Sequence, residues 1–201
     1  MSLNFRAHTN QSTSFLTTLQ QALGTALGHR PDASAILRET LESDSTQSFE
    51  ALLENLGKRN CAPAFFVLCS PEKAVLMEKD YTSAKLTSND KFLPCANHDA
   101  RVEDWTQEEF NTWATALKDP LLTSTIARKQ CAIDSAHHVK NVQDLKRLTQ
   151  TWPVLNSLTT FGVIMSPERG TIDWGAWYKE PPTTPAGMEN WGGDFTPATR
   201  E

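Results

Sequence analysis

The stretch LPCANHD, residues 93–99, ends an apolar run with three side chains that can do chemistry: Asn97, His98 and Asp99. An asparagine amide on a rigid element can donate a hydrogen bond to a developing oxyanion. In an extended segment Asn97 and Asp99 face one side and His98 the other, so the three cannot line one pocket without a bend. The same residues are typical of an ordinary polar turn, and both interpretations stay open at this point.

A second candidate is the basic pair Arg128 and Lys129, which falls in a predicted helix. The guanidinium of Arg128 could be directed into a site, where its fork of donors would hold a carboxylate or another polar group of a substrate. A solvated basic helix face is the alternative.

Metal and cofactor chemistry is not expected. His137 and His138 are adjacent, so on a helix they point about 100° apart and make a poor joint metal site. The chain contains no GxSxG, HExxH, P-loop or GxGxxG motif. Its four cysteines form no CxxC pair, and we expect them to be buried, reduced thiols; they are Cys61, Cys69, Cys95 and Cys131.

The composition is that of an ordinary globular protein. The chain has 201 residues, 39% of them hydrophobic and 21% charged, with a net charge of −5. No long basic run is present, so nucleic acid and anionic membranes are disfavoured as partners. No transmembrane stretch and no secretory signal stand out. We therefore expect a cytoplasmic protein as the chain stands, or a lysosomal or secreted one if an upstream part is missing.

The first part of the chain predicts one strand, three helices and then a sheet. SLNFR near the N-terminus alternates apolar and polar residues, as a strand does. Helical spacing and stop signals predict helices over 14–28, 29–43 and 45–59, the last ending at Gly57.

The β segments that follow predict an antiparallel meander. Strands are expected over the residue ranges 62–70, 73–80, 82–86 and 91–97. The Ser70-Pro71 turn joins the first two strands, and Pro94 marks the last as an edge, a bulge or a strand end.

The rest of the chain predicts further helices, a closing hairpin and a tail. Thr106 and Glu109 have the spacing of a capping box for a helix over 107–119. The expected elements after it are helices over 120–136 and 142–152 and a hairpin over 158–179. Consecutive helices and hairpins favour an α+β layered fold. We expect one domain over residues 1–179 and a Pro/Gly/Thr-rich tail over 180–201.

Several stretches together resemble the C-terminal part of the acid ceramidase and N-acylethanolamine-hydrolysing acid amidase family. Their order and spacing agree with the family over roughly residues 1–178. The stretches are RPDASAILRETLESDSTQSFEALLENLGK, PAFFVLCSPEKAVLMEKD, FLPCANHD, IARKQCAI and LTQTWPVLNSLTTFGVIMSPERGT.

The resemblance implies an N-terminal-nucleophile hydrolase with an αββα sandwich. Members of the family expose an N-terminal cysteine whose thiol attacks the fatty-acyl amide of a ceramide or N-acylethanolamine, while its own α-amino group serves as the base. The acyl-enzyme that forms is then released by water. No cofactor or metal is implied.

By position in the family's motifs, Asn97 matches the asparagine that stabilises the tetrahedral intermediate, and Arg128 matches the active-site arginine. His98 stands where the family has a tyrosine, and the aromatic residue after the aspartate is absent. None of the four cysteines is followed by the family's "RN-D" motif. The chain therefore resembles the downstream part of such an enzyme, with an incomplete sandwich and without its nucleophile. Two interpretations remain: a partial hydrolase for a lipid amide, or an inactive remnant that serves as a lipid-binding or protein-interaction module.

Overall fold

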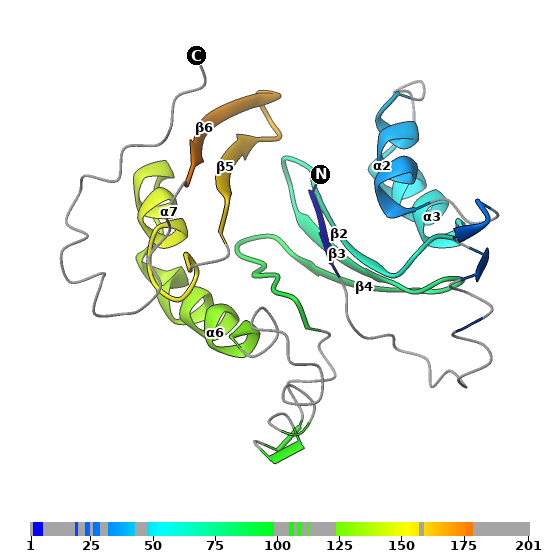
Figure 1. Cartoon of the computed structure of the whole chain (residues 1–201). Coiled ribbons are helices and arrows are strands. Elements are labelled where there is room, and N and C mark those ends of the chain that lie inside the picture. The colour runs from blue at the N-terminus through cyan, green and yellow to red at the C-terminus, as the bar shows by residue number, and fades with distance from the viewer. Residues whose placement is uncertain are drawn as a thin grey trace. The chain divides into compact units, whose positions relative to one another are not determined.

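A computed structural model describes the chain at the residues 2–5, 19, 23–24, 26–28, 32–42, 48–98, 105–106, 108–109, 112, 124–156 and 159–178. Helices and small antiparallel sheets are both present, so the fold is of the mixed α+β class (Figure 1). The chain divides into two compact units, Met1–Phe110 and Asn111–Glu201, and each is described by itself. The expected tail over 180–201 lies outside the described residues. The expectation of one domain over residues 1–179 stays a prediction.

The first unit contains a four-stranded antiparallel sheet with the strand order β1-β2-β3-β4. Its strands are β1 (Ser2–Phe5), β2 (Ala64–Cys69), β3 (Ala74–Lys79) and β4 (Ala84–Asn89). The strand expected at the N-terminus is confirmed, and so is the hairpin formed by the second and third strands.

The strand expected over 91–97 is wrong. Asn89 ends β4, and its side-chain Oδ1 accepts hydrogen bonds from the backbone N–H groups of Lys91 and Phe92 at 2.8 and 3.1 Å. This turn leads the chain out of the sheet, and Pro94 further on has no N–H with which to continue a ladder. The fourth place in the sheet belongs to β1, which pairs with β2 on its other edge.

Two helices precede β2 along the chain, as expected. In α2 (Ala33–Glu42), Asp32 accepts a hydrogen bond from the backbone N–H of Ala35 at 2.8 Å. In α3 (Phe49–Lys58), the Ser48 side chain accepts from the N–H of Ala51 at 3.2 Å. Both contacts satisfy N–H groups that the first turn of a helix leaves open.

The end of α3 differs from the expectation by one residue. Gly57 was expected to stop the helix, but α3 continues through it to Lys58. The chain turns to extended backbone only at Arg59, whose φ and ψ are −71° and 136°. Gly57 therefore does not act as the left-handed cap that glycine often provides.

The core of the first unit lies between the two helices and one face of the sheet. Alternate strand residues point to this face because successive side chains of a strand point to opposite sides. The buried cluster consists of Ala33, Ile36, Leu53, Leu56, Cys61, Ala64, Phe66, Leu68, Val75 and Met77. Burial of each of its larger side chains contributes roughly 1.5–3 kcal/mol.

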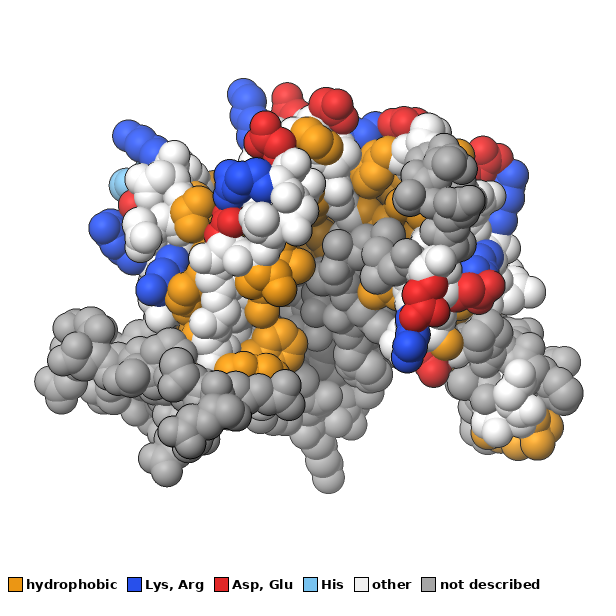
Figure 2. Space-filling model, turned by 90° about the horizontal axis from the view of Figure 1, so that it is seen from above, with side chains coloured by type: hydrophobic (Ala, Val, Ile, Leu, Met, Phe, Trp, Pro, Cys, Tyr) orange, Lys and Arg blue, Asp and Glu red, His pale blue; other side chains and the backbone are white. Residues whose placement is uncertain are grey.

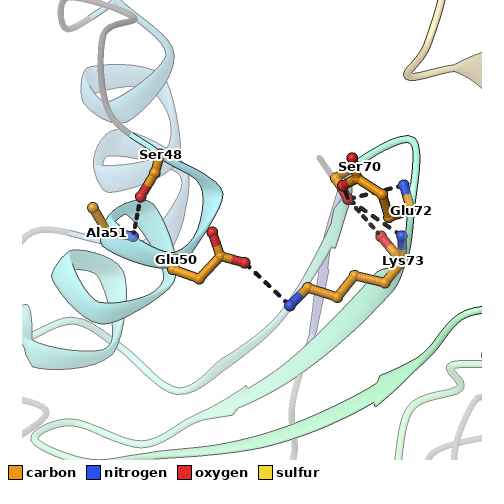
Figure 3. A network of polar contacts seen from close by, with 6 residues as sticks. All are labelled: Ser48, Glu50, Ala51, Ser70, Glu72 and Lys73. Atoms are coloured by element: carbon orange, nitrogen blue, oxygen red, sulfur yellow. Dashed lines mark hydrogen bonds and ion pairs between the residues drawn. The ribbon is translucent and has the colours of Figure 1, made fainter.

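The turn between β2 and β3 is tied to α3 through a polar network (Figure 3). The Ser70 hydroxyl accepts hydrogen bonds from the backbone N–H groups of Glu72 and Lys73, both at 3.2 Å. The Lys73 ammonium reaches across to the Glu50 carboxylate at 3.2 Å and lies 5.8 Å from the ring centroid of Phe49. The turn thus holds both the strand pair and the first turn of the helix.

The helix start expected at Thr106 is confirmed as far as it is described. The Thr106 hydroxyl donates to the Glu109 carboxylate at 2.8 Å, and the N–H of Glu109 donates back to the hydroxyl at 3.2 Å. The N–H of Thr106 also donates to the same carboxylate at 2.7 Å, which completes a capping box. Most of the expected helix over 107–119, and most of that over 14–28, lies outside the described residues.

The second unit contains helices followed by a hairpin, as expected. Its elements are α6 (Thr125–Ser135), the short 3₁₀ helix η2 (Ala136–His138), α7 (Val142–Thr149), β5 (Phe161–Ser166) and β6 (Thr171–Trp177). The two strands form a two-stranded antiparallel sheet. Gly170 has a φ of 62° in the turn between them, a conformation that favours glycine.

One face of the β5–β6 hairpin is packed. Leu155, Ala176 and Tyr178 are buried together, with Trp174 against them. The ammonium of Lys146 on α7 lies 5.4 Å from the ring centroid of Trp174. A Cβ built on Gly162 would meet the Trp174 ring at 3.1 Å, so a larger residue there requires the ring to shift by a few tenths of an ångström.

Candidate functional site

Asn97 lies in an irregular segment after β4, between two buried neighbours. Ala96 is 7% exposed and His98 is 4% exposed, while Asn97 itself is half-buried. Neighbours packed in this way hold the backbone of Asn97 in place. Asn97 lies in no strand, and its role as an oxyanion donor stays a prediction.

Arg128 lies in the first turn of α6. Its Nε donates a hydrogen bond to the Ser124 hydroxyl at 3.2 Å, and the residue is half-buried. Burial lowers the pKa of the Arg128 guanidinium, because removal from water disfavours the charged form. The partial burial argues against a fully solvated basic face at this position. Lys129 is half-buried as well.

The structure does not bring the two expected site residues together in one described body. Asn97 belongs to the first unit and Arg128 to the second. Their joint placement in a single site therefore stays a prediction. Asp99, the third polar residue of the LPCANHD stretch, lies outside the described residues.

The four cysteines differ in their surroundings. Cys61 is buried, and this burial raises the pKa of its thiol, which makes it a poor nucleophile. Cys95 and Cys131 are half-buried and donate weakly to the carbonyl oxygens of Ala96 and Trp152, at 3.5 and 3.7 Å. The expectation of buried thiols is confirmed for Cys61 but wrong for Cys69, which is exposed at the end of β2. Cys69 follows Leu68 of the core cluster, so its side chain points to the opposite side of the strand.

The described residues contain no group of three or more His, Cys, Asp or Glu side chains placed to hold a metal ion. His137 and His138 are exposed and stack with ring centroids 3.8 Å apart. Among the helices of the described part, none is long and apolar enough to cross a membrane.

Sequence reasoning missed a run of buried charges at the end of the third strand. Glu78, Lys79 and Asp80 are 1%, 0% and 2% exposed. The Lys79 ammonium donates to the carbonyl oxygens of Asp80 and Ser83 at 2.8 and 3.1 Å, and a Glu78 carboxylate oxygen lies 3.8 Å from the ammonium of Lys85. These contacts fix the β3–β4 turn, which gives the run a structural role.

Sequence reasoning also missed that the second face of the β5–β6 hairpin is exposed. Hydrophobic side chains are open on the surface in the view from above (Figure 2). On this hairpin the exposed residues are Phe161, Val163, Met165, Ile172 and Trp177, at 55%, 40%, 50%, 70% and 51% exposure. We call these five residues the hairpin face. The period-2 spacing of Phe161, Val163 and Met165 was the available signal.

No model of a known protein family matches the sequence, and no curated protein matches it significantly.

Proposed function

We propose that the chain is the part of an amide hydrolase of the acid ceramidase type that stabilises the reacting amide, while the nucleophilic thiol comes from outside these 201 residues. The substrate class is a fatty-acyl amide, such as a ceramide or an N-acylethanolamine. The proposal includes the αββα layering that the resemblance implies.

The observation that carries the proposal is the position of Arg128. Its guanidinium is half-buried on the first turn of α6 and is held by Ser124, so it is not an ordinary solvated helix charge. Withdrawing a charge from water costs free energy, and proteins retain such charges where they pair with a partner or a ligand. In this proposal a polar group of the substrate joins the contacts that Arg128 already makes.

In the reaction, the thiolate adds to the amide carbonyl carbon, and the carbonyl oxygen becomes an oxyanion. The side-chain amide N–H of Asn97 donates a hydrogen bond to that oxyanion. The C–N bond then breaks, the amine leaves with a proton, and water hydrolyses the thioester to a free fatty acid. Arg128 holds the polar part of the substrate through these steps.

The surroundings of the cysteines support the external origin of the nucleophile. The buried Cys61 has a raised pKa, and none of the four cysteines is followed by the "RN-D" motif of the family that the sequence resembles. The coding sequence upstream of residue 1 tests this directly. An in-frame cysteine followed by an "RN-D" motif is the expected result, and unrelated or frame-disrupted sequence at that place would contradict it.

The site residues are tested in the protein expressed from the upstream sequence joined to this chain. Ceramide and N-acylethanolamine are the substrates. We expect Asn97→Ala to lower kcat by about 10²- to 10³-fold, with Asn60→Ala, an exposed asparagine, as the matched control. Arg128→Lys should lower kcat/KM roughly 10- to 100-fold, and Lys129→Ala should not. If the control variants lose as much kcat or kcat/KM as the Asn97 and Arg128 variants do, neither residue belongs to the site.

A second candidate function is favoured by the hairpin face. In this case the chain is an inactive relative that binds lipid or protein through exposed apolar side chains. This candidate would be favoured over the hydrolase if the upstream sequence is disrupted and if the Asn97 and Arg128 variants bind lipid or protein as well as the unchanged chain does.

A further inference from the structure

We propose that the hairpin face is a self-association surface, and that it packs against the same face of a second copy of this chain. The five residues of the face share one side of the two-stranded sheet because of the strand register. Phe161 pairs with Trp177, and Val163 pairs with Gly175. A register shift between Ile164 and Met165 then places Ile172 opposite Met165, so the apolar surface continues toward the turn.

One edge of this small sheet, the strand β5, is not protected as edge strands usually are. Within the described residues, β5 and β6 pair only with each other. The FGVIM stretch of β5 has no charge and no proline, whereas β4 at the edge of the larger sheet reads AKLTSN and is exposed along its whole length. Lysine and polar residues on an exposed edge discourage pairing with other chains. The β5 strand has no such protection and therefore favours association.

The size of the face suits a small dimer. From the exposed fractions of its side chains, the face presents on the order of 500 Å² of apolar surface, which is at the upper end for a monomer. Two copies would bury about 1,000 Å² in total, the lower bound for a specific interface.

The charges around the face do not oppose a second copy. None of its five residues is charged. The nearby Asp173 carboxylate is neutralised by an ion pair with Arg169 and accepts a hydrogen bond from the Thr171 hydroxyl at 2.8 Å. A twofold interface brings each side chain near its own copy, so like charges in the face would repel. An uncharged face is self-complementary in this respect.

Gly175 gives the face a shape that a second copy can fill. It lies opposite Val163 on the exposed side and is itself exposed. A Cβ built there would meet nothing nearer than the carbonyl oxygen of Gly162 at 3.9 Å. Because Gly175 has no side chain, an apolar side chain of the partner copy can approach the strand closely there.

The test is sedimentation equilibrium of the purified 201-residue chain over a range of concentrations. We expect a reversible monomer–dimer equilibrium that Ile172→Lys weakens roughly tenfold or more in Kd. Leu86→Lys on β4 is the matched control, because Leu86 is 50% exposed outside the face, and it should leave Kd unchanged. Met165→Ser is a milder second variant, and circular dichroism verifies that both variants fold.

Three results would overturn the proposal. A monomer at every concentration would show that the face does not self-associate. Equal weakening by Leu86→Lys would place the interface elsewhere. The third result is that the chain forms no dimer but co-sediments with phosphatidylcholine vesicles, and that Ile172→Lys abolishes this co-sedimentation. The face would then bind lipid and not a second copy.

Discussion

The two hairpins of this chain turn on nearly the same residues, SPEK at 70–73 and SPERG at 166–170, but their strands have different surroundings. The β2–β3 hairpin has β1 on one edge and β4 on the other, and its inner face is covered by α2 and α3. The β5–β6 hairpin has one packed face, one apolar exposed face and no described neighbour on either edge. Turn chemistry therefore decides that a hairpin forms, while the strands beside it and the helices packed on it decide what it exposes.

The largest contrast is expected for the same change in the two hairpins. Phe66→Ala in β2 removes a fully buried ring and should lower the free energy of unfolding by about 3–5 kcal/mol. Phe161→Ala in β5 removes a ring that is 55% exposed, and the loss should be far smaller at concentrations where the chain is monomeric. Urea denaturation measures both, and similar losses would mean that the hairpin face is covered in the monomer.

A second contrast lies within the β5–β6 hairpin, between its two glycines. Gly162→Ala forces a Cβ to within 3.1 Å of Trp174 and should cost about 1–3 kcal/mol of unfolding free energy. Gly175→Ala has open space and should cost little. Thermal unfolding of the two variants tests this, and an equal shift in Tm would contradict the assignment of packed and exposed faces.

The two turn serines give a smaller contrast. Ser70 accepts from two backbone N–H groups, at Glu72 and Lys73, whereas Ser166 accepts from one, at Arg169 at 3.3 Å. Ser70→Ala should therefore lower the unfolding free energy by roughly 1 kcal/mol, and Ser166→Ala by less. Urea denaturation in which Ser166→Ala is the more damaging change would reverse the expected order.

The smallest effect concerns the exposed ion pair between the first hairpin and α3. A hydrogen bond from its own backbone N–H, and then the Lys73 ammonium, hold the pKa of Glu50 below its ordinary value of 4.5. A lowered pKa in the folded state means that the contribution to stability is present above the unfolded pKa and lost as the pH falls through the folded pKa. Because the group is exposed, the effect is slight.

NMR titration of the side-chain carboxyls measures the lowered pKa of Glu50. Lys73→Met should raise the pKa of Glu50 toward 4.5, while the pKa of Glu54, which Lys58 lowers, stays where it is. An unchanged Glu50, or an equal change at Glu54, would show that Lys73 does not act on Glu50.

The elements that the sequence predicts well are those with local causes. The Ser48 cap, the Thr106 capping box and both proline turns are each set by residues a few positions apart. The pairing of β1 with β2 joins residues as distant as Ser2 and Val67, and no local pattern identifies it. For that reason the segment 91–97 was wrongly given the fourth place in the sheet.

The candidate site shows the same division. The amide of Asn97 and the guanidinium of Arg128 are identified by residue type and by resemblance, but their partial burial comes from tertiary packing. The buried Glu78, Lys79 and Asp80 show the reverse case, because a charged run is ordinarily predicted to be solvated. In both cases the sequence does not show which segments of the chain pack against the side chain, and that packing determines its burial.

The most direct test of the central claim, that the nucleophile lies outside this chain, is an assay of the purified 201-residue chain with ceramide and with N-acylethanolamine. We expect no thiol-dependent hydrolysis: treatment with a thiol-alkylating reagent should not change the rate at which either substrate is hydrolysed. Thiol-dependent turnover that disappears when Cys61, Cys69, Cys95 or Cys131 is replaced by serine would contradict the claim and would place the nucleophile within these residues.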